Sequence, residues 1–245
     1  MEKVALITGA SKGLGFETAY QLGVKGYTVI VAARTQQKSN ETAEKLKSKG
    51  LHAVGMQLDV VNDNDVDNLS KSINEHFGKL DVLVNNAGVQ LDFPGFMPGN
   101  STETVSMDIL KQTFEINYFA PIALTQKLLP LLKKSTAGRI VNVSSIMGSL
   151  ALHADSNSPI YGIKLLAYNS SKTALNQFTL HLAEAMKDSP IKVNSAHPGW
   201  VKTDLGGEYA PMSIEDGVKT IVDLSTLDEN GPTGAFIHLG ESLPW

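Results

Sequence analysis

Cysteine is absent from the 245-residue chain, which excludes disulfide bonds, thiolate catalysis and metal sites with cysteine ligands. The six histidines show no i, i+4 pairing, so we expect no zinc site and no other bound metal. No run of about 18 apolar residues suggests a membrane span. The net charge of −4 comes without a basic cluster, which argues against a nucleic-acid partner.

The remaining composition is that of an ordinary globular protein, with 42% hydrophobic and 19% charged residues. Although the chain is long for one domain, α/β folds of this size are routinely single, so we expect one domain over residues 1–245. The segment Met1-Glu2-Lys3 leads straight into an apolar run and leaves no room for a signal peptide, which predicts a cytoplasmic protein.

The stretch from Val4 to Gly15 begins as an apolar, partly β-branched run, which predicts a strand that is buried on both faces. A turn with Gly9, Gly13 and Gly15 follows, and helical spacing starts at Phe16. Glycines at such a turn allow positive φ and let the backbone approach a diphosphate at the start of a helix. The stretch therefore predicts the opening of a dinucleotide-binding unit.

Apolar runs alternate with helical patterns along the rest of the chain, which is the order of a doubly wound α/β fold. We predict strands in the run from Val4 and over residues 28–33, 52–58, 80–84, 139–144, 191–196 and 234–239. We predict helices over residues 13–25, 41–49, 65–77, 108–134 with a kink at Pro121, 168–186 and 214–225. The expected fold is a single-domain Rossmann fold, a parallel sheet of about seven strands flanked by helices.

The segment from Tyr27 to Asn40 contains no acidic residue, although an NAD enzyme places Asp or Glu near its ribose 2′-hydroxyl. Arg34 stands at the end of the second predicted strand, about twenty residues past Gly15, and Lys12 lies in the glycine turn. Both cations suit the extra phosphate of NADP, so we expect NADP(H) as the cofactor. The alternative is that Arg34 is only a solvated residue after a strand.

Four motifs carry a family resemblance: Thr8-Gly9-x-x-x-Gly13-x-Gly15, Asn85-Asn86-Ala87-Gly88, Tyr168-x-x-x-Lys172 and Pro198-Gly199. The glycine spacing differs from the Gly-x-Gly-x-x-Gly of other dinucleotide folds and resembles that of the short-chain dehydrogenase/reductase family. The resemblance covers essentially the whole chain.

The resemblance implies a cofactor site that runs along the ends of the predicted strands. Its members are Gly9, Ser11, Lys12, Gly13, Leu14, Gly15, Arg34, Asp59, Val60, Asn86, Ala87, Gly88, Tyr168, Lys172, Pro198, Gly199, Val201 and Thr203. By resemblance Asp59 contacts the adenine amino group, and the segment around Pro198 cradles the nicotinamide carboxamide. Asp59 could equally begin the turn before the next helix, and the Asn85-Asn86 pair could be a turn only.

The resemblance also implies four catalytic residues, Asn117, Ser145, Tyr168 and Lys172. No Gly-x-Ser-x-Gly surrounds Ser145 and nothing nearby supplies a histidine base, so a serine hydrolase is excluded. The i, i+4 spacing puts Tyr168 and Lys172 on one helical face, in a stripe that continues with Leu175, Phe178, Leu182 and Met186. Lys172 should therefore face the protein, although it could also reach out past the start of the helix.

Three segments are expected to cover the substrate, residues 89–104, 146–167 and 199–213, and within the last one residues 205–212 should form a mobile lid. The candidate substrate contacts are Phe93, Met147, Trp200 and Tyr209. The second segment makes the distance from Ser145 to Tyr168 longer than in the shortest family members, which resembles the carbonyl-reductase type.

The resemblance implies an NADPH-dependent carbonyl reductase that acts on a small carbonyl or alcohol. Ser145 would hold the substrate oxygen, Tyr168 would give it a proton, Lys172 would favour the tyrosinate and bind the ribose, and Asn117 would tether a water molecule. Two alternatives stay open, a 3-oxoacyl-(carrier protein) reductase and a non-catalytic NADP-sensing regulator. A homo-oligomer, dimer or tetramer, is weakly favoured over a monomer.

Overall fold

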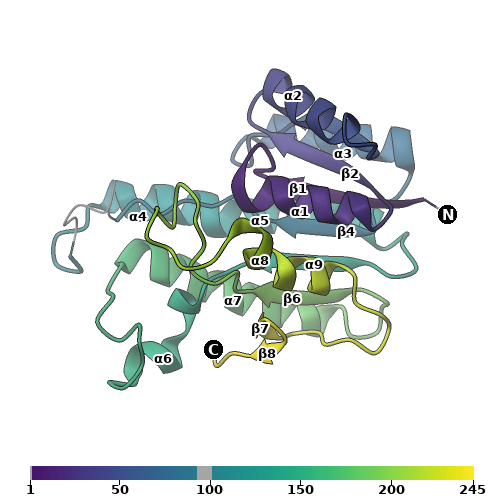
Figure 1. The fold of residues 1–245 in the computed structure, drawn as a ribbon. Coiled ribbons are helices and arrows are strands. Elements are labelled where there is room, and N and C mark those ends of the chain that lie inside the picture. The colour runs from purple at the N-terminus through teal and green to yellow at the C-terminus, as the bar shows by residue number, and fades with distance from the viewer. Residues whose placement is uncertain (1, 93–100) are drawn as a thin grey trace.

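The computed structural model describes residues 2–92 and 101–245, and within them it contains one sheet of eight strands in the order β3-β2-β1-β4-β5-β6-β7-β8 (Figure 1). The seven parallel strands are β1 (Lys3–Thr8), β2 (Tyr27–Ala33), β3 (Ala53–Gln57), β4 (Val82–Asn85), β5 (Arg139–Val143), β6 (Lys192–Ala196) and β7 (Phe236–His238). The two-residue strand β8 (Glu241–Ser242) is antiparallel to β7 and lies outside the predicted set. The predicted doubly wound α/β fold is confirmed.

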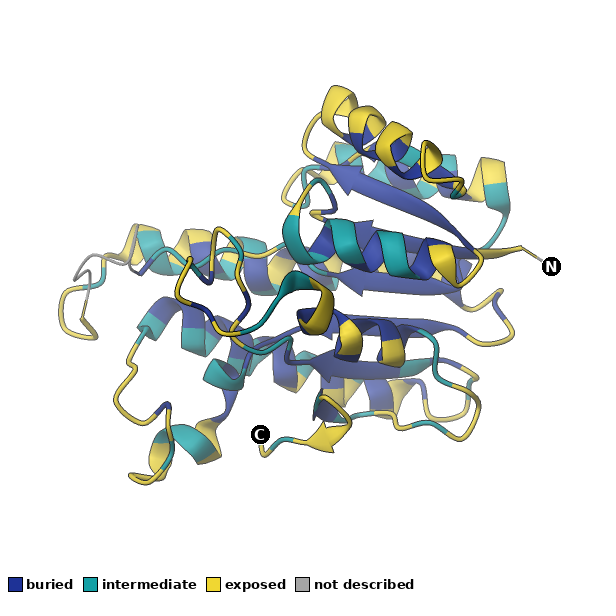
Figure 2. Cartoon of the chain, viewed as in Figure 1, coloured by how far each residue is buried: buried dark blue, intermediate teal, exposed yellow. Residues whose placement is uncertain are grey.

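Helices cover both faces of this sheet, and their outer sides are exposed, while the central strands are buried (Figure 2). The longer helices are α1 (Gly13–Val24), α2 (Gln36–Lys47), α3 (Asp63–Phe77), α4 (Met107–Phe114), α5 (Ala120–Leu132) and α7 (Leu166–Ala185). The shorter ones are α6 (Leu150–Ala154), α8 (Ile214–Gly217) and α9 (Lys219–Ser225), with a π-helical turn η2 (Glu115–Phe119) and a 3-10 turn η3 (Ile146–Gly148).

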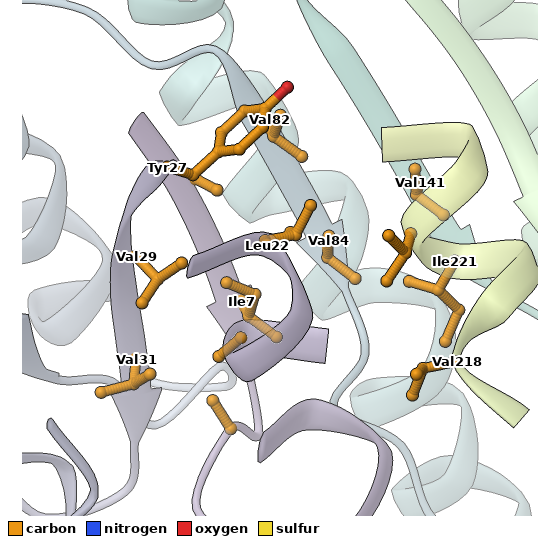
Figure 3. Close-up of a cluster of buried hydrophobic side chains, with 14 of the residues drawn as sticks. Ile7, Leu22, Tyr27, Val29, Val31, Val82, Val84, Val141, Val218 and Ile221 are labelled. Carbon is orange, nitrogen blue, oxygen red and sulfur yellow. The ribbon is translucent and has the colours of Figure 1, made fainter. Parts of the chain in front are cut away.

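The core has two apolar layers because successive strand residues point to opposite faces. Ile7 of β1 packs with Leu22 of α1 and Ile221 of α9 on one face, as Figure 3 shows. Leu6 packs with α3, α5 and the end of α7 on the other face. Fully burying such a side chain contributes about 1.5–3 kcal/mol, so the alternation along β1 stabilises both layers at once.

Three predicted helices differ from those observed. The helix expected at Glu41 starts at Gln36, because the Thr35 hydroxyl accepts a hydrogen bond from the Lys38 amide and caps it. The helix expected over 108–134 is interrupted by the π-helical turn η2, and the helix expected over 214–225 is divided between α8 and α9 at Val218. Pro121 follows η2 and has no N–H to donate to the carbonyl of Asn117, which accounts for the interruption.

A ladder of buried polar side chains crosses the sheet near the carboxyl ends of its strands. The Asn85 amide nitrogen donates to Thr125 of α5 at 3.1 Å and to Asn142 of β5 at 2.8 Å. Asn142 donates in turn to Thr179 of α7 at 2.9 Å, and Thr179 shares a hydrogen bond with Ser195 of β6 at 2.8 Å. The ladder joins three strands to two helices on one face of the sheet.

Replacing Asn142 by alanine should lower the free energy of unfolding by about 2 kcal/mol. Two buried hydrogen bonds are lost, and the buried side chains of Asn85 and Thr179 each lose a hydrogen-bond partner. Urea unfolding followed by circular dichroism measures this change. The exposed Asn230 is the control, since Asn230→Ala should change the free energy by less than about 0.5 kcal/mol. Equal effects of the two substitutions would show that the ladder does not stabilise the fold.

Candidate active site

The glycine turn between β1 and α1 has the backbone that its residues require. Gly9 and Gly13 have φ angles of +63° and +57°, in the left-handed region that favours glycine. A Cβ on Gly15 would lie 2.5 Å from the Gly9 carbonyl oxygen and 2.6 Å from the amide nitrogen of Asn86. Within the described residues, no side chain caps the start of α1, so its first amides can bind an anion.

The Asn85-Asn86-Ala87-Gly88 segment is fixed against this turn by Thr8. The Thr8 hydroxyl accepts hydrogen bonds from the amides of Asn86 and Ala87 at 3.0 and 2.9 Å, and the Asn86 side chain donates to the Thr8 carbonyl at 2.8 Å. A Cβ on Gly88 would lie 3.3 Å from Oδ1 of Asn117 and 3.5 Å from Nζ of Lys172. The segment therefore runs from the glycine turn to two of the predicted catalytic residues.

Asn117 lies in the π-helical turn η2 and is buried. Its carboxamide accepts from the Val89 amide and donates to the Val89 carbonyl, both at 2.8 Å, and it donates to the hydroxyl of Ser171 at 3.0 Å. The side chain thus joins the segment after β4 to helix α7. Neither Val89 nor Ser171 is predicted as its partner from the sequence.

Ser145 and Tyr168 meet at the end of β5. The Ser145 hydroxyl accepts a hydrogen bond from the Met147 amide at 3.2 Å. Burial raises the pKa of Tyr168 above its usual value, and a side-chain hydrogen bond with Ser145 opposes that shift. The opposing influence comes from Ser145 and not from the ammonium of Lys172, which the family resemblance implies.

Lys172 is buried, with 5% of its surface exposed, so it does not reach out past the start of the helix. Its Nζ donates to the Val143 carbonyl at 2.8 Å and lies 5.7 Å from the centroid of the Tyr168 ring. Burial lowers the pKa of Lys172 to about 8. Both Tyr168 and Lys172 therefore have pKa values shifted toward their neutral forms.

The rest of the predicted stripe on α7 is only partly correct. Leu175 and Met186 are buried, but Phe178 and Leu182 are only partly so. The polar Asn176 and Thr179 are buried instead and bond to Ser144 and to the ladder.

The predicted phosphate-binding cations differ in their surroundings. Arg34 is exposed directly after β2. Lys12 forms an exposed ion pair with Asp204, a partner that no sequence pattern indicates. Asp59 accepts from the Val61 amide at 3.3 Å, which supports its interpretation as a turn residue, and the partly buried Val60 is part of the same turn.

The Pro198-Gly199 segment returns toward the glycine turn. Gly199 has a φ angle of +90°, Val201 is buried, and Cγ2 of Thr203 lies 3.7 Å from where a Cβ on Gly13 would stand. Burial and the neighbouring His238 lower the pKa of His197 to about 3, which favours the neutral imidazole at neutral pH. Ser11 and Leu14 are partly buried beside this contact.

Two of the expected substrate loops gather with α4 on the side where the parallel strands end, away from the N-terminus (Figure 1). Met147 is partly buried two residues after Ser145. Tyr209 is 93% exposed, and Trp200 is 54% exposed with its indole nitrogen donating to the Gly206 carbonyl at 2.7 Å. Phe93 lies outside the described residues.

Among the described residues, no helix has the length and the apolar composition that a membrane span requires. No group of three or more His, Cys, Asp or Glu side chains within those residues could hold a metal ion.

Residues 3–213 match the family model described as short chain dehydrogenase. The chain belongs to this family. "Carbonyl reductase [NADPH] 1" of Mus musculus is 31% identical to this short-chain dehydrogenase over 284 residues, covering 99% of this chain and 98% of the relative. "Short-chain dehydrogenase/reductase 1" of Saponaria officinalis is 31% identical over 293 residues, covering 100% of this chain and 96% of the relative. The solved structure of the NADPH-bound carbonyl reductase from chicken fatty liver superimposes with a TM-score of 0.85 at 28% identity. The match covers 100% of this chain and 99% of the chicken protein.

The pKa of Lys172 makes the stability of this short-chain dehydrogenase depend on pH. Between a folded value of about 8 and the usual 10.5, the unfolded state binds more protons, so stability rises with pH across that range. A pKa change of one corresponds to about 1.4 kcal/mol. Burying the charged form of Lys172 therefore costs roughly 3 kcal/mol below pH 8.

Lys172→Met removes this cost. The free energy of unfolding of the variant, minus that of the unchanged protein, should fall by roughly 3 kcal/mol between pH 7.5 and pH 10.5. Urea unfolding at several pH values measures this difference, in which the titration of all other groups cancels. A difference that stays constant with pH would mean that the pKa of Lys172 is not lowered in the folded protein.

Proposed function

We propose that this short-chain dehydrogenase is an NADPH-dependent carbonyl reductase, which converts a ketone or aldehyde to an alcohol. The neighbouring hydroxyls of Ser145 and Tyr168 carry the proposal, because a hydroxyl that can hold an oxygen lies beside one that can protonate it. The buried Lys172 has its Nζ 5.7 Å from the centroid of the Tyr168 ring. The printed names of the mouse and chicken proteins support NADPH and carbonyl reduction by analogy.

The residues present fit a dinucleotide. The glycine turn leaves no room for side chains at Gly15, and the uncapped start of α1 suits a diphosphate. Arg34 is exposed at the end of β2 and available to the additional phosphate of NADP, and Lys12 would exchange Asp204 for that phosphate. Asn86, Ala87 and Gly88, together with Thr203 and its neighbours, would line the remaining length of the cofactor.

The bound nicotinamide would supply a hydride to the carbonyl carbon. Ser145 would hold the carbonyl oxygen, and Tyr168 would transfer its proton to that oxygen as the C–O bond becomes single. A raised pKa keeps Tyr168 protonated at neutral pH, which suits a proton donor in the reductive direction.

Proton return to Tyr168 is assigned to Lys172 and Asn117. Lys172 has a pKa near neutrality and can pass on a proton, and it would also hold the nicotinamide ribose. Pro121 cannot donate to the carbonyl of Asn117, so that oxygen can accept a hydrogen bond from a water molecule. The carboxamide of Asn117 is already engaged with Val89 and Ser171.

The substrate would lie between Met147 and the lid, with Trp200, Tyr209 and Phe93 as contacts. A 3-oxoacyl-(carrier protein) reductase is less favoured, because an acidic carrier would meet a chain of net charge −4. NADPH consumption on a panel of aryl ketones, diketones and acetoacetyl thioesters separates the two activities. A regulator that only senses NADP would consume NADPH with none of them.

Tyr168→Phe should preserve folding and NADPH affinity but lower kcat by about 10²–10⁴, because the variant lacks the hydroxyl that donates the proton. Stopped-flow absorbance at the nicotinamide band measures the rate, and fluorescence titration measures NADPH affinity. Tyr20→Phe on α1 is the matched control and should leave kcat unchanged. Near-normal turnover of Tyr168→Phe would refute the assignment of the proton donor.

The unchanged enzyme should prefer NADPH to NADH by about 10² or more in kcat/KM, since hydrogen bonds to charged groups contribute roughly 1.5–3 kcal/mol each. Arg34→Leu should reduce this preference at least tenfold, and adding Ala33→Asp should invert it by repelling the phosphate and binding the ribose. Lys45→Leu removes a positive charge at the far end of α2 and should have no effect. NADH use within about threefold of NADPH by the unchanged enzyme would contradict the NADP assignment.

A further inference from the structure

Asp92 is a fully buried acidic residue that the proposed reaction does not use. Its two carboxylate oxygens accept hydrogen bonds from the amides of Ala167 and Tyr168, each at 2.9 Å. These partners lie 75 and 76 residues away along the chain. The contact therefore joins the segment after β4 to the first turn of α7.

Helix α7 has no cap of its own at this end. Leu165 occupies the N-cap position, and a leucine side chain cannot accept hydrogen bonds from the first-turn amides. Asp92 supplies the missing acceptors from outside the helix, and its charge suits the positive end of the helix dipole. One of the two amides that it holds belongs to Tyr168 itself.

The segment from Val89 to Asp92 is held at both of its ends. At the first end, the carboxamide of Asn117 bonds to both the amide and the carbonyl of Val89. At the other end, Asp92 bonds to α7, and Asn117 also bonds to Ser171 one turn further along that helix. The backbone of Tyr168 is thus fixed by contacts on both sides of its helical turn.

We propose that Asp92 is a positioning residue, which sets the place of the Tyr168 hydroxyl relative to Ser145 by holding the backbone amide of Tyr168. A small rotation of the first turn of α7 would move the end of the Tyr168 ring much further than it moves the backbone. Proton transfer depends steeply on such displacements, so the effect falls on kcat. The proposal rests on the proposed function for its kinetic consequence, but not for the contact itself.

Asp92→Asn tests this role with little change in volume. The variant retains one oxygen acceptor and presents an NH₂ group to the other amide, so one of the two hydrogen bonds is lost. With a ketone that the unchanged enzyme reduces, kcat should fall at least tenfold while the KM for NADPH stays within threefold. The solvent deuterium isotope effect on kcat should increase, because transfer of the proton from Tyr168 becomes slower.

Asn62→Ala is the matched control. Asn62 caps α3 through two amide hydrogen bonds, at 3.0 and 3.2 Å, and α3 carries none of the proposed catalytic residues. This variant should lose thermal stability yet keep kcat and its isotope effect. If Asp92→Asn keeps kcat within twofold, or shows an unchanged isotope effect, the positioning role is wrong.

Hydrogen exchange separates this proposal from the proposed function. In Asp92→Asn the amides of residues 166–169 should exchange at least tenfold faster than in the unchanged protein, while those of α3 should not change. If the unchanged protein reduces no carbonyl compound, the proposed function fails, and faster exchange at these positions still supports the role of Asp92 in holding α7. Unchanged exchange there would overturn that role whatever the activity.

Discussion

Burying the ammonium of Lys172 is the constraint that organises the carboxyl end of the sheet. The ammonium donates a hydrogen bond to the Val143 carbonyl, and the backbone of neighbouring segments lies close to the lysine. A Cβ on Gly148 would lie 2.8 Å from the backbone of Lys172, and one on Gly88 would lie 3.5 Å from its Nζ. Two glycines from separate loops therefore make room for one helix and its lysine.

The cost of this arrangement is offset elsewhere in the fold. Both faces of the central strands are covered by apolar side chains, and the polar ladder from Asn85 to Ser195 fixes helices α5 and α7 against the sheet. A rigid apolar framework of this kind lets polar groups with shifted pKa values be held in one geometry. The apolar layers thus supply stability on both faces of the sheet, and the polar ladder lies close to the chemistry at the carboxyl ends of the strands.

Sequence patterns predict structure that depends on neighbouring residues, but they do not predict contacts between segments that are far apart in the chain. The strand from Val4 and the glycine turn are correct because the buried runs and the required φ angles are local properties. Pro121 predicts an irregularity in the long helix, but no periodicity signals the π-helical turn at Asn117 or the bond between Asn117 and Val89. The Asp92 contact spans 75 residues, and its one trace in the sequence is the absence of a capping residue at Leu165.

The two halves of the candidate site differ in how firmly they are held. Around Tyr168 the hydrogen bonds to Asp92 from the amides of Ala167 and Tyr168 and from Asn117 to Ser171 are buried, so a change at one of them disturbs the others. At the cofactor rim, Arg34 is exposed and the ion pair of Lys12 with Asp204 is open to solvent, where such pairs contribute little. Coenzyme preference can therefore change through exposed residues that few other contacts depend on, whereas a change in the geometry of proton transfer disturbs buried contacts.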